Sequence, residues 1–215
     1  MIRLLCILLG YVFGLFQTAY FYGKLKGIDI RTKGSGNAGT TNTLRVLGTK
    51  AGFIVLIGDI AKTVIAIALT RWLIVPGHEE LEYLLVIYTA AGAILGHNYP
   101  FYMQFKGGKG IAATAGLLFS FHPLLAVTGV CVFLLIFNIT HYVSLGSLTV
   151  YVVFLSQLIY LGQTLGLGRI EQGTLNEMYV ITFLLMVMAF WKHRENIVRL
   201  VKKEERKTYL FKKNK

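Results

Sequence analysis

The sequence predicts an all-α, polytopic membrane protein with seven transmembrane helices. Two observations lead to this prediction: the share of apolar residues, and the distribution of lysine and arginine along the chain. Of the 215 residues, 55% are hydrophobic and only 15% are charged, and the mean hydropathy is +0.61. This balance excludes a soluble domain of ordinary composition, so the chain is expected to lie in a bilayer.

Six stretches of the chain are apolar enough to form spans, since a transmembrane helix needs about 20 mainly apolar residues. They occupy residues 1–22, 51–75, 83–96, 111–138, 143–165 and 178–191. Arg3 precedes the first apolar run, as in a signal peptide, but the run is too long and no small-residue cleavage site follows it. We therefore expect one integral-membrane domain over residues 1–200 and a basic cytoplasmic tail over residues 201–215.

The positive residues predict the orientation, because loops that face the cytoplasm collect lysine and arginine. Eighteen of the 22 lie within residues 23–50, 98–110 and 192–215. The connections 76–82 and 166–177 carry glutamates and only one arginine, Arg169. The amino terminus is then outside, and the basic carboxyl terminus is cytoplasmic only if the number of spans is odd.

The stretch 111–138 supplies the additional crossing. Pro123 lacks a backbone donor and disfavours helix at His122, so two short helices are expected to meet at His122-Pro123. The alternative is one kinked helix, which gives six spans and leaves the basic tail outside. That arrangement would place ten positive residues on the wrong side.

Other classes of site and partner are less well supported. The formal charge of +12 is concentrated in loops, where orientation and anionic membrane lipids explain it without nucleic acid. Cys6 and Cys131 lie in separate apolar runs, so neither a disulfide nor a metal site is indicated. Asp59 and Lys62 are about one helical turn apart within a predicted span, and we interpret them as a structural ion pair.

The first polar motif is GSGNAGTTN at residues 34–42, with Arg45 close behind it. Its glycines allow tight turns that expose backbone N–H groups, and such concave arrays bind anions, particularly where they open toward a helix amino terminus. An ordinary flexible loop with a helix cap is the alternative. The candidate ligand-binding residues here are Gly34, Ser35, Gly36, Asn37, Gly39, Thr41, Asn42 and Arg45.

The second motif is GHNYPFYMQFKGGKG at residues 96–110, which joins two predicted spans. Glycine permits close approach of the backbone to a ligand, and lysine supplies a point charge suited to phosphate. Interfacial lysines that only orient the protein would not require the glycines, and the spacing is not that of a nucleotide-binding P-loop. The candidates here are His97, Lys106, Gly107, Gly108, Lys109 and Gly110.

The third motif is KHRENIVRL at residues 192–200, where the last predicted span ends. His193 and Asn196 are three residues apart and share one face of a helix, and Arg199 extends that face. An interfacial amphipathic helix is the structural alternative. The remaining residues are expected to form a solvated basic extension against anionic lipid headgroups.

In order and spacing, GSGNAGTTN with Arg45, GHNYP followed by FKGGKGIAAT, and HRENIVRL resemble the motifs of the bacterial acyl-phosphate-dependent glycerol-3-phosphate acyltransferases, the PlsY family. The resemblance covers nearly the whole chain. It implies an enzyme of the bacterial inner membrane with its site on the cytoplasmic side, using no cofactor. The implied reaction transfers a fatty acyl group from acyl phosphate to the sn-1 hydroxyl of glycerol 3-phosphate, giving lysophosphatidate and phosphate.

The resemblance also implies roles for individual residues. Arg45 and a lysine would bind the phosphate of glycerol 3-phosphate, and the backbone of Gly107-Gly108 would bind acyl phosphate. The catalytic set would be Ser35, Arg45, Lys109, His193 and Asn196, and the other candidates of the three motifs would bind substrate. Two positions depart from the family pattern, which has alanine at Thr40 and glycine at Lys203.

Some choices remain open at the level of sequence. The hydroxyl proton could pass to His193 or to the leaving phosphate, and either Lys106 or Lys109 could meet a given phosphate, although the flanking glycines favour Lys109. None of the five histidines begins the HxxxxD box of acyltransferases that use acyl-CoA or acyl carrier protein. The rival function is a transporter for a small phosphorylated solute, but polar motifs at one interface and the lack of an internal repeat disfavour it.

Overall fold

The computed structural model describes residues 1–165, 167 and 170–210, and all regular structure in these residues is helical. The α-helices are α1 (Ile2–Gly14), α2 (Thr18–Leu25), α3 (Thr40–Leu47), α4 (Thr49–Leu73), α5 (Glu82–Asn98), α6 (Ile111–Phe121), α7 (Pro123–Thr140), α8 (Val143–Tyr160), α9 (Gln172–Lys192) and α10 (Arg194–Val201). Short 3₁₀ turns occur at Ile30–Thr32, Glu79–Leu81 and Phe101–Met103, and a π-helical turn at Leu161–Leu165. Arg169 and the last five residues of the predicted tail lie outside the described residues.

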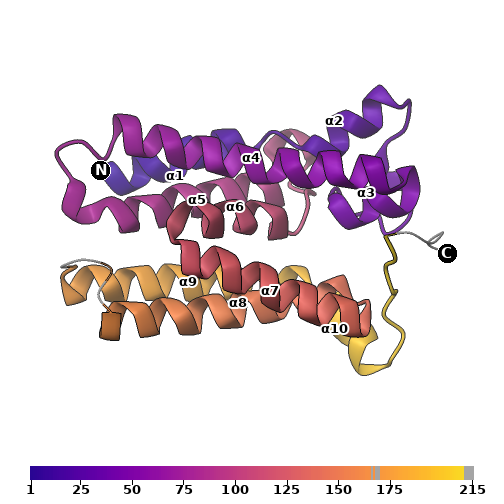
Figure 1. Cartoon of the computed structure of the whole chain (residues 1–215). Coiled ribbons are helices and arrows are strands. Elements are labelled where there is room, and N and C mark those ends of the chain that lie inside the picture. The colour runs from indigo at the N-terminus through magenta and orange to yellow at the C-terminus, as the bar shows by residue number, and fades with distance from the viewer. Residues whose placement is uncertain (166, 168–169, 211–215) are drawn as a thin grey trace.

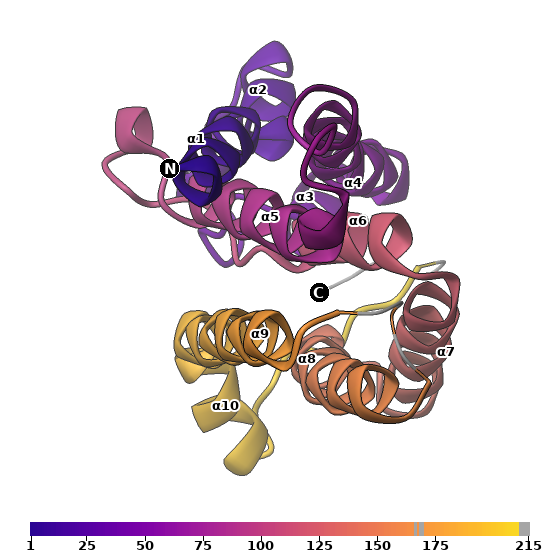
Figure 2. The same ribbon diagram turned by 90° about the vertical axis from the view of Figure 1, so that its left-hand side faces the viewer.

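The helices form two layers. Helices α1 to α6 make the first layer and α7 to α10 the second, as Figures 1 and 2 show from two directions. The layers meet where α5 packs on α9 and α6 on α7. Two apolar clusters join them, and in the larger one Ile87 and Leu117 of the first layer pack with Phe154, Leu158 and Met178 of the second. The two layers therefore share one core.

Five helical stretches are long and apolar enough to cross a membrane by length and composition: Ile2–Leu25, Thr49–Leu73, Pro123–Thr140, Val143–Thr164 and Gln172–Lys192. Helices α5 and α6 are shorter, with 17 and 11 residues. Large apolar side chains such as Leu8, Val127, Leu135 and Leu184 are exposed on the outer faces of the long helices. Such faces suit contact with lipid rather than water.

The predicted helix break at Pro123 is confirmed. Helix α6 ends at Phe121 and α7 begins at Pro123, while the extended His122 between them caps α7 by accepting a hydrogen bond from the Leu124 amide at 3.2 Å. The prediction that both helices are short is wrong for α7, which has 18 residues. Proline at the first helical position starts a helix without loss of a hydrogen bond, so nothing limits the length of α7.

The first predicted span also contains a break that the sequence analysis missed. Helix α1 ends at Gly14 and α2 begins at Thr18, with the amide side chain of Gln17 fully buried between them. Its Nε2 donates to the carbonyl oxygens of Gly14 at 3.1 Å, Gly96 at 3.3 Å and His97 at 3.1 Å. A buried polar side chain thus satisfies carbonyls at the ends of both α1 and α5.

Helices α1 and α5 pack backbone to backbone through paired GxxxG motifs. Gly10 and Gly14 lie on α1, and Gly92 and Gly96 lie on α5. A Cβ atom at any of these four positions would collide with backbone atoms of the other helix. The contacts pair successive residues of α1 with successive residues of α5, so the two helices run parallel and end at the same side of the molecule.

Candidate active site

A cleft of about 1090 Å³ is lined by residues of both layers, with α3, the first turn of α6 and α10 at its polar end. The sequence analysis named sixteen candidate residues, and fifteen of them line this cleft. Gly108 is the exception. Segments that are far apart in the sequence, residues 34–45, 97–110 and 193–196, are therefore brought to one site.

The first loop is shaped by Asn42. This side chain is buried; its Oδ1 accepts from the amide of Ser35 at 2.8 Å, and its Nδ2 donates to the carbonyls of Ile30 at 3.1 Å and Lys33 at 3.0 Å. All these bonds are within the protein, so Asn42 holds the loop rather than offering its side chain to a ligand. The exposed Ser35 is left as a hydroxyl donor at the cleft.

Arg45 lies on α3 and is only partly accessible. Its Nη2 donates to the carbonyl of Arg206 at 3.0 Å and to Oγ1 of Thr208 at 2.7 Å. Its Nε is buried and has no hydrogen-bond partner among the described residues. Burial lowers the pKa of the Arg45 guanidinium, but an arginine remains charged in proteins. A buried cationic donor without a partner, on the wall of a cleft, suits an anionic ligand.

The glycines of the second loop serve close packing. The amide of Gly107 donates to the Asn98 carbonyl at 3.2 Å and that of Gly108 to the His97 carbonyl at 3.0 Å. A Cβ at Gly107 would strike the His97 carbonyl, and one at Gly108 would strike the His97 ring. Both amides are therefore already bonded to the end of α5, and neither is a free donor for the acyl phosphate that the Gly107-Gly108 backbone was expected to bind.

Free donors occur instead at the start of α6. Gly110 adopts φ 81° and precedes the helix, with no side chain capping the first turn. The first amides of a helix have no intrahelical acceptor and carry a partial positive charge. Gly110, Ile111 and Ala112 all line the cleft, so this end of α6 faces it. Backbone donors and the Lys109 ammonium together have the chemistry that suits a phosphate group.

The predicted ion pair behind this loop is confirmed and includes a third side chain. Nζ of Lys62 lies 2.9 Å from Oδ1 of Asp59 and 2.8 Å from Nδ1 of His97, and it donates to the Phe16 carbonyl at 2.8 Å. Because an ammonium only donates, Nδ1 of His97 is the acceptor and its Nε2 carries the proton. The three buried side chains tie the end of α5, on which the glycine loop packs, to the end of α1.

Lys109 reaches across the cleft to α10. Its ammonium donates to Oδ1 of Asn196, whose Nδ2 donates in turn to Oε1 of Glu205 at 2.6 Å. Burial lowers the pKa of Lys109 to about 8. The two layers thus meet through a direct contact between two residues predicted to be catalytic.

His193 caps the end of α9 and is buried, with its ring lining the cleft. Its Nδ1 lies 2.8 Å from the Ala189 carbonyl. Since a carbonyl oxygen only accepts, Nδ1 carries the proton and Nε2 is the acceptor. Burial lowers the pKa of His193 to about 4, so the ring is neutral at physiological pH.

The segment after α10 contains residues that line the cleft and that the sequence analysis missed. Glu205 is buried and accepts from Asn196 at 2.6 Å, Ser144 at 2.8 Å and Arg199 at 2.8 Å. Burial alone would raise the pKa of Glu205, but hydrogen bonds from these three donors hold it below its ordinary value. The expectation of a solvated extension is wrong for Glu205 and for Thr208, which is also buried.

The rest of the cleft is apolar. Phe53 and Ile60 of α4, Leu118 of α6, and Val130 and Phe133 of α7 line it beyond the polar end. This lining joins the cationic end without a break, so one ligand could place a charged group at Lys109 and a hydrocarbon chain between the layers. Among the described residues there is no group of three or more His, Cys, Asp or Glu side chains that could hold a metal ion.

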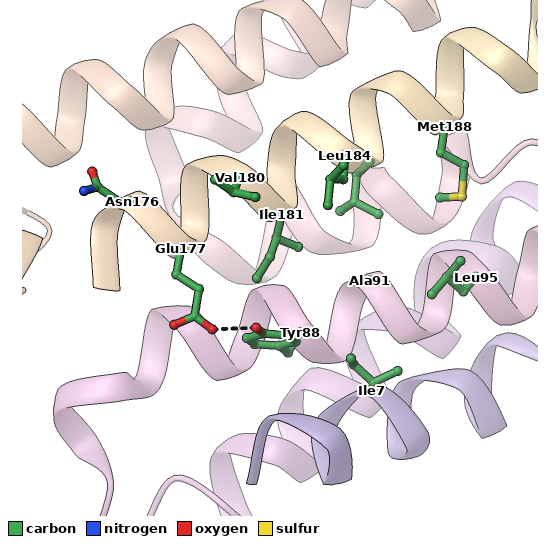
Figure 3. Close-up of a pocket in the computed structure, with 11 residues that line it drawn as sticks. Ile7, Tyr88, Ala91, Leu95, Asn176, Glu177, Val180, Ile181, Leu184 and Met188 are labelled. Atoms are coloured by element: carbon green, nitrogen blue, oxygen red, sulfur yellow. Dashed lines mark hydrogen bonds between the residues drawn. The ribbon is translucent and has the colours of Figure 1, made fainter. Parts of the chain in front are cut away.

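A second groove, of about 630 Å³, lies between α1, α5 and α9 (Figure 3). Its polar end is Glu177, which is already paired with Arg3 at 2.7 Å and with the Tyr88 hydroxyl at 2.5 Å. Glu177 is near the start of α9 and His193 follows its end, so the polar end of this groove is at the far end of the helix from the predicted catalytic residues. It offers no cation for phosphate.

Comparison with known proteins gives consistent matches along the chain. A family model described as "Glycerol-3-phosphate acyltransferase" matches residues 4–203. A glycerol-3-phosphate acyltransferase of Bacillus velezensis is 37% identical over 212 residues, covering 98% of this chain and 100% of the relative. One from Bacillus subtilis is also 37% identical, over 210 residues, covering 96% of this chain and 98% of the relative.

Two solved structures resemble the whole fold. One is a crystal structure of PlsY (YgiH), an integral membrane glycerol 3-phosphate acyltransferase, in its glycerol 3-phosphate form. The TM-score is 0.82 at 30% identity, covering 98% of this chain and 99% of that chain. The lysophosphatidic acid form of the same protein gives a TM-score of 0.79 at 30% identity, covering 97% and 96%.

Proposed function

Because the chain belongs to the glycerol-3-phosphate acyltransferase family, and is thus a multi-pass membrane enzyme that makes lysophosphatidate for phospholipid synthesis, we propose that its direct acyl donor is acyl phosphate. The observation that carries this proposal is the cleft itself, which joins a cationic, amide-rich end to an apolar channel between the layers. A lipid-soluble acyl phosphate has both of these characters. A transporter function is set aside, since the chain is an enzyme of this family.

We assign the phosphate of glycerol 3-phosphate to the Arg45 side of the cleft. The unpartnered Nε of Arg45 supplies a charge-assisted donor, and the hydroxyl of the exposed Ser35, which lines the same cleft, supplies another. The solved structure in its glycerol 3-phosphate form belongs to a relative of the same fold, which supports a site for this substrate. Ser35 acts in this proposal as a donor rather than a nucleophile, because no base is bonded to its hydroxyl among the described residues.

We assign the phosphate of the donor to Lys109 and the first turn of α6, with its acyl chain along the apolar wall. In this place the α6 amides and the lysine charge stabilise the negative charge that develops on the leaving group. The two substrates then approach from different sides, glycerol 3-phosphate from water and acyl phosphate from lipid. Both reactive groups meet between Lys109 and His193.

The chemistry needs orientation more than a covalent intermediate, since acyl phosphate is an activated anhydride. The glycerol hydroxyl oxygen attacks the acyl carbonyl carbon, the bond from that carbon to the phosphate oxygen breaks, and phosphate leaves with the electron pair. His193, with a pKa of about 4, is a weaker base than a phosphate group, whose second pKa lies near 6. We therefore assign the proton to the leaving phosphate, while Nε2 of His193 accepts a hydrogen bond from the other hydroxyl of glycerol 3-phosphate and so orients the glycerol.

The proposed topology has seven crossings, with the amino terminus outside and the active site on the cytoplasmic face of the bacterial inner membrane. It treats α1 with α2 as one span and includes the shorter α5 and α6, the latter paired with α7 at His122-Pro123. The parallel run of α1 and α5 supports it, because three crossings from α1 through α4 to α5 return the chain to its first direction. The basic residues after α10 would then face anionic lipid headgroups.

Labelling of single cysteines tests this topology. In a background with Cys131, the exposed native cysteine, replaced by serine, Glu80→Cys should react with an impermeant reagent from outside intact cells. Lys202→Cys, just after α10, should react only after permeabilisation. Equal labelling of both from outside would contradict the odd number of crossings.

The donor assignment has a direct test. Purified protein in detergent, given acyl phosphate and labelled glycerol 3-phosphate, should form lysophosphatidate and one phosphate for each product molecule. Acyl-CoA and acylated acyl carrier protein at the same concentration should give no product. Comparable rates with acyl-CoA, or no product with acyl phosphate, would refute the assignment.

A further inference from the structure

The chain turns back after α10 and returns to the first layer, as the yellow segment in Figure 1 shows. The turn is a Schellman motif, in which the Glu204 amide donates to the Arg199 carbonyl at 2.7 Å and the Lys203 amide to the Leu200 carbonyl at 3.1 Å. Lys203 has φ 59°, as this motif requires. We call residues 204–210 the strap. It passes along the polar end of the cleft toward α3 and α4.

The strap is fixed at Thr208. This residue is 2% exposed, and its amide donates to the His141 carbonyl, just after α7, at 2.9 Å. Its hydroxyl accepts from Nη2 of Arg45 at 2.7 Å. A second bond, from Oγ1 of Thr49 to the Leu210 carbonyl at 2.8 Å, fixes the strap to the start of α4 without touching Arg45. Thr208 thus connects the second layer to an arginine of the first.

The bonds to the strap decide which donors of Arg45 remain. Nη2 has two hydrogens, and the Arg206 carbonyl and the Thr208 hydroxyl accept them. Nε therefore stays free of the strap, buried and without a partner among the residues described. An arginine held in this way has already lost the side-chain freedom that binding would otherwise cost.

We propose that Thr208 is a positioning residue, which orients Arg45 so that its remaining donors meet the phosphate of glycerol 3-phosphate. The proposal rests on the function proposed above for Arg45. It places part of the substrate affinity in the strap, whose residue 208 lies beyond the 4–203 span of the family match. The Arg206 contact is a backbone carbonyl, so Thr208 is the side chain through which substitution can change the orientation.

The test compares three single substitutions in the full-length protein purified in detergent. Thr208→Val keeps the shape and removes the acceptor, Thr208→Ser keeps the acceptor, and Thr49→Val removes the other strap bond. Calorimetric titration gives the dissociation constant for glycerol 3-phosphate alone, and initial rates give KM for each substrate. The titration needs no acyl donor, so an error in the donor assignment would not obscure the result.

For Thr208→Val we expect the dissociation constant and KM for glycerol 3-phosphate to rise roughly tenfold, since a hydrogen bond to a charged group is lost. The KM for the acyl donor and the thermal midpoint should stay at wild-type values. Thr208→Ser should restore the affinity, and Thr49→Val should leave it unchanged. A chain ended after Lys207 should show the same loss as Thr208→Val.

Three results would overturn the proposal. The first is an unchanged affinity for glycerol 3-phosphate in both Thr208→Val and the shortened chain. The second is an equal rise of KM for both substrates, which indicates general loss of structure. The third is the same loss in Thr49→Val, which would mean that strap attachment, rather than contact with Arg45, sets the affinity.

Discussion

Raising the pH above 8 should weaken substrate binding, because Lys109 then loses its positive charge. Burial of this ammonium lowers its pKa to about 8, whereas a lysine in water has a pKa near 10.4. The charged form therefore predominates below pH 8 and is lost as the pH rises through that value. At pH 9 only about one molecule in ten keeps the charge that we propose pairs with phosphate.

The expected magnitude follows from this titration. Phosphate groups are almost fully ionised above pH 7, so the substrates change little over the same range. We expect kcat/KM, which reports the pKa values of the free enzyme, to fall about tenfold for each pH unit above 8. Lys109→Arg should have lower activity at pH 7.5 because its planar fork fits differently, but it should remain flat to about pH 9.5, since arginine keeps its proton.

Initial rates between pH 7 and 9.5 measure this, with labelled lysophosphatidate as the product and the spontaneous hydrolysis of acyl phosphate subtracted. Lys106→Arg is the matched control, because Lys106 belongs to the same loop but is exposed and should leave the midpoint unmoved. A wild-type profile that stays flat to pH 9.5 would refute the reasoning. So would an alkaline fall in Lys109→Arg with the same midpoint as in wild type.

Three further predictions concern stability, each measured as the thermal midpoint in detergent. Lys203→Gly should raise the midpoint by about 1–4 °C. A left-handed residue with a Cβ costs about 1–2 kcal/mol, and the added conformational freedom of glycine in the unfolded chain cancels only part of this gain. Lys202→Gly is the control, and it should lower the midpoint because Lys202 has φ −77°. Gly96→Ala should cost about 1–3 kcal/mol, since its Cβ would strike the Tyr11 carbonyl, whereas Gly173→Ala, which meets only the Glu171 side chain at 3.7 Å, should be neutral; equal effects would contradict the close packing of α1 on α5. Lys62→Met should cost about 3–5 kcal/mol, because Asp59 is left charged and buried, and adding Asp59→Leu should recover much of that loss; no recovery in the double variant would argue against the ion pair as the cause.

The sequence predicted the all-helical membrane class and the break at Pro123, because apolar runs and a proline act locally. It also predicted that the three polar motifs lie on the same side of the membrane, because lysine and arginine are concentrated in the segments that contain them. In agreement with that prediction, fifteen of the sixteen candidate residues line one cleft. Motif position alone, however, could not distinguish a residue that binds a ligand from one that holds the loop, as Asn42 and Gly108 illustrate.

What the sequence did not reveal depends on contacts between distant segments. Gln17 in an apolar run and Glu205 in a basic tail carried a weak signal, namely a lone residue of opposite character to its surroundings. Their partners lie up to 80 residues away for Gln17 and 61 for Glu205, and no periodicity encodes such pairs. The one local clue to the strap was Lys203, which stands where the family pattern has glycine and proves to adopt a left-handed conformation.

The candidate site is divided between the two layers, so its geometry depends on how the layers are placed relative to one another. Arg45 and Lys109 belong to the first layer, and His193 and Asn196 belong to the second. The first layer includes α5 and α6, which are shorter than the 25 residues of α4. A change in bilayer thickness therefore changes the hydrophobic mismatch of these helices by different amounts. Turnover in vesicles should therefore depend on the chain length of the surrounding lipid. The thickness of the bilayer around the enzyme is set by lipids that are themselves made from its product.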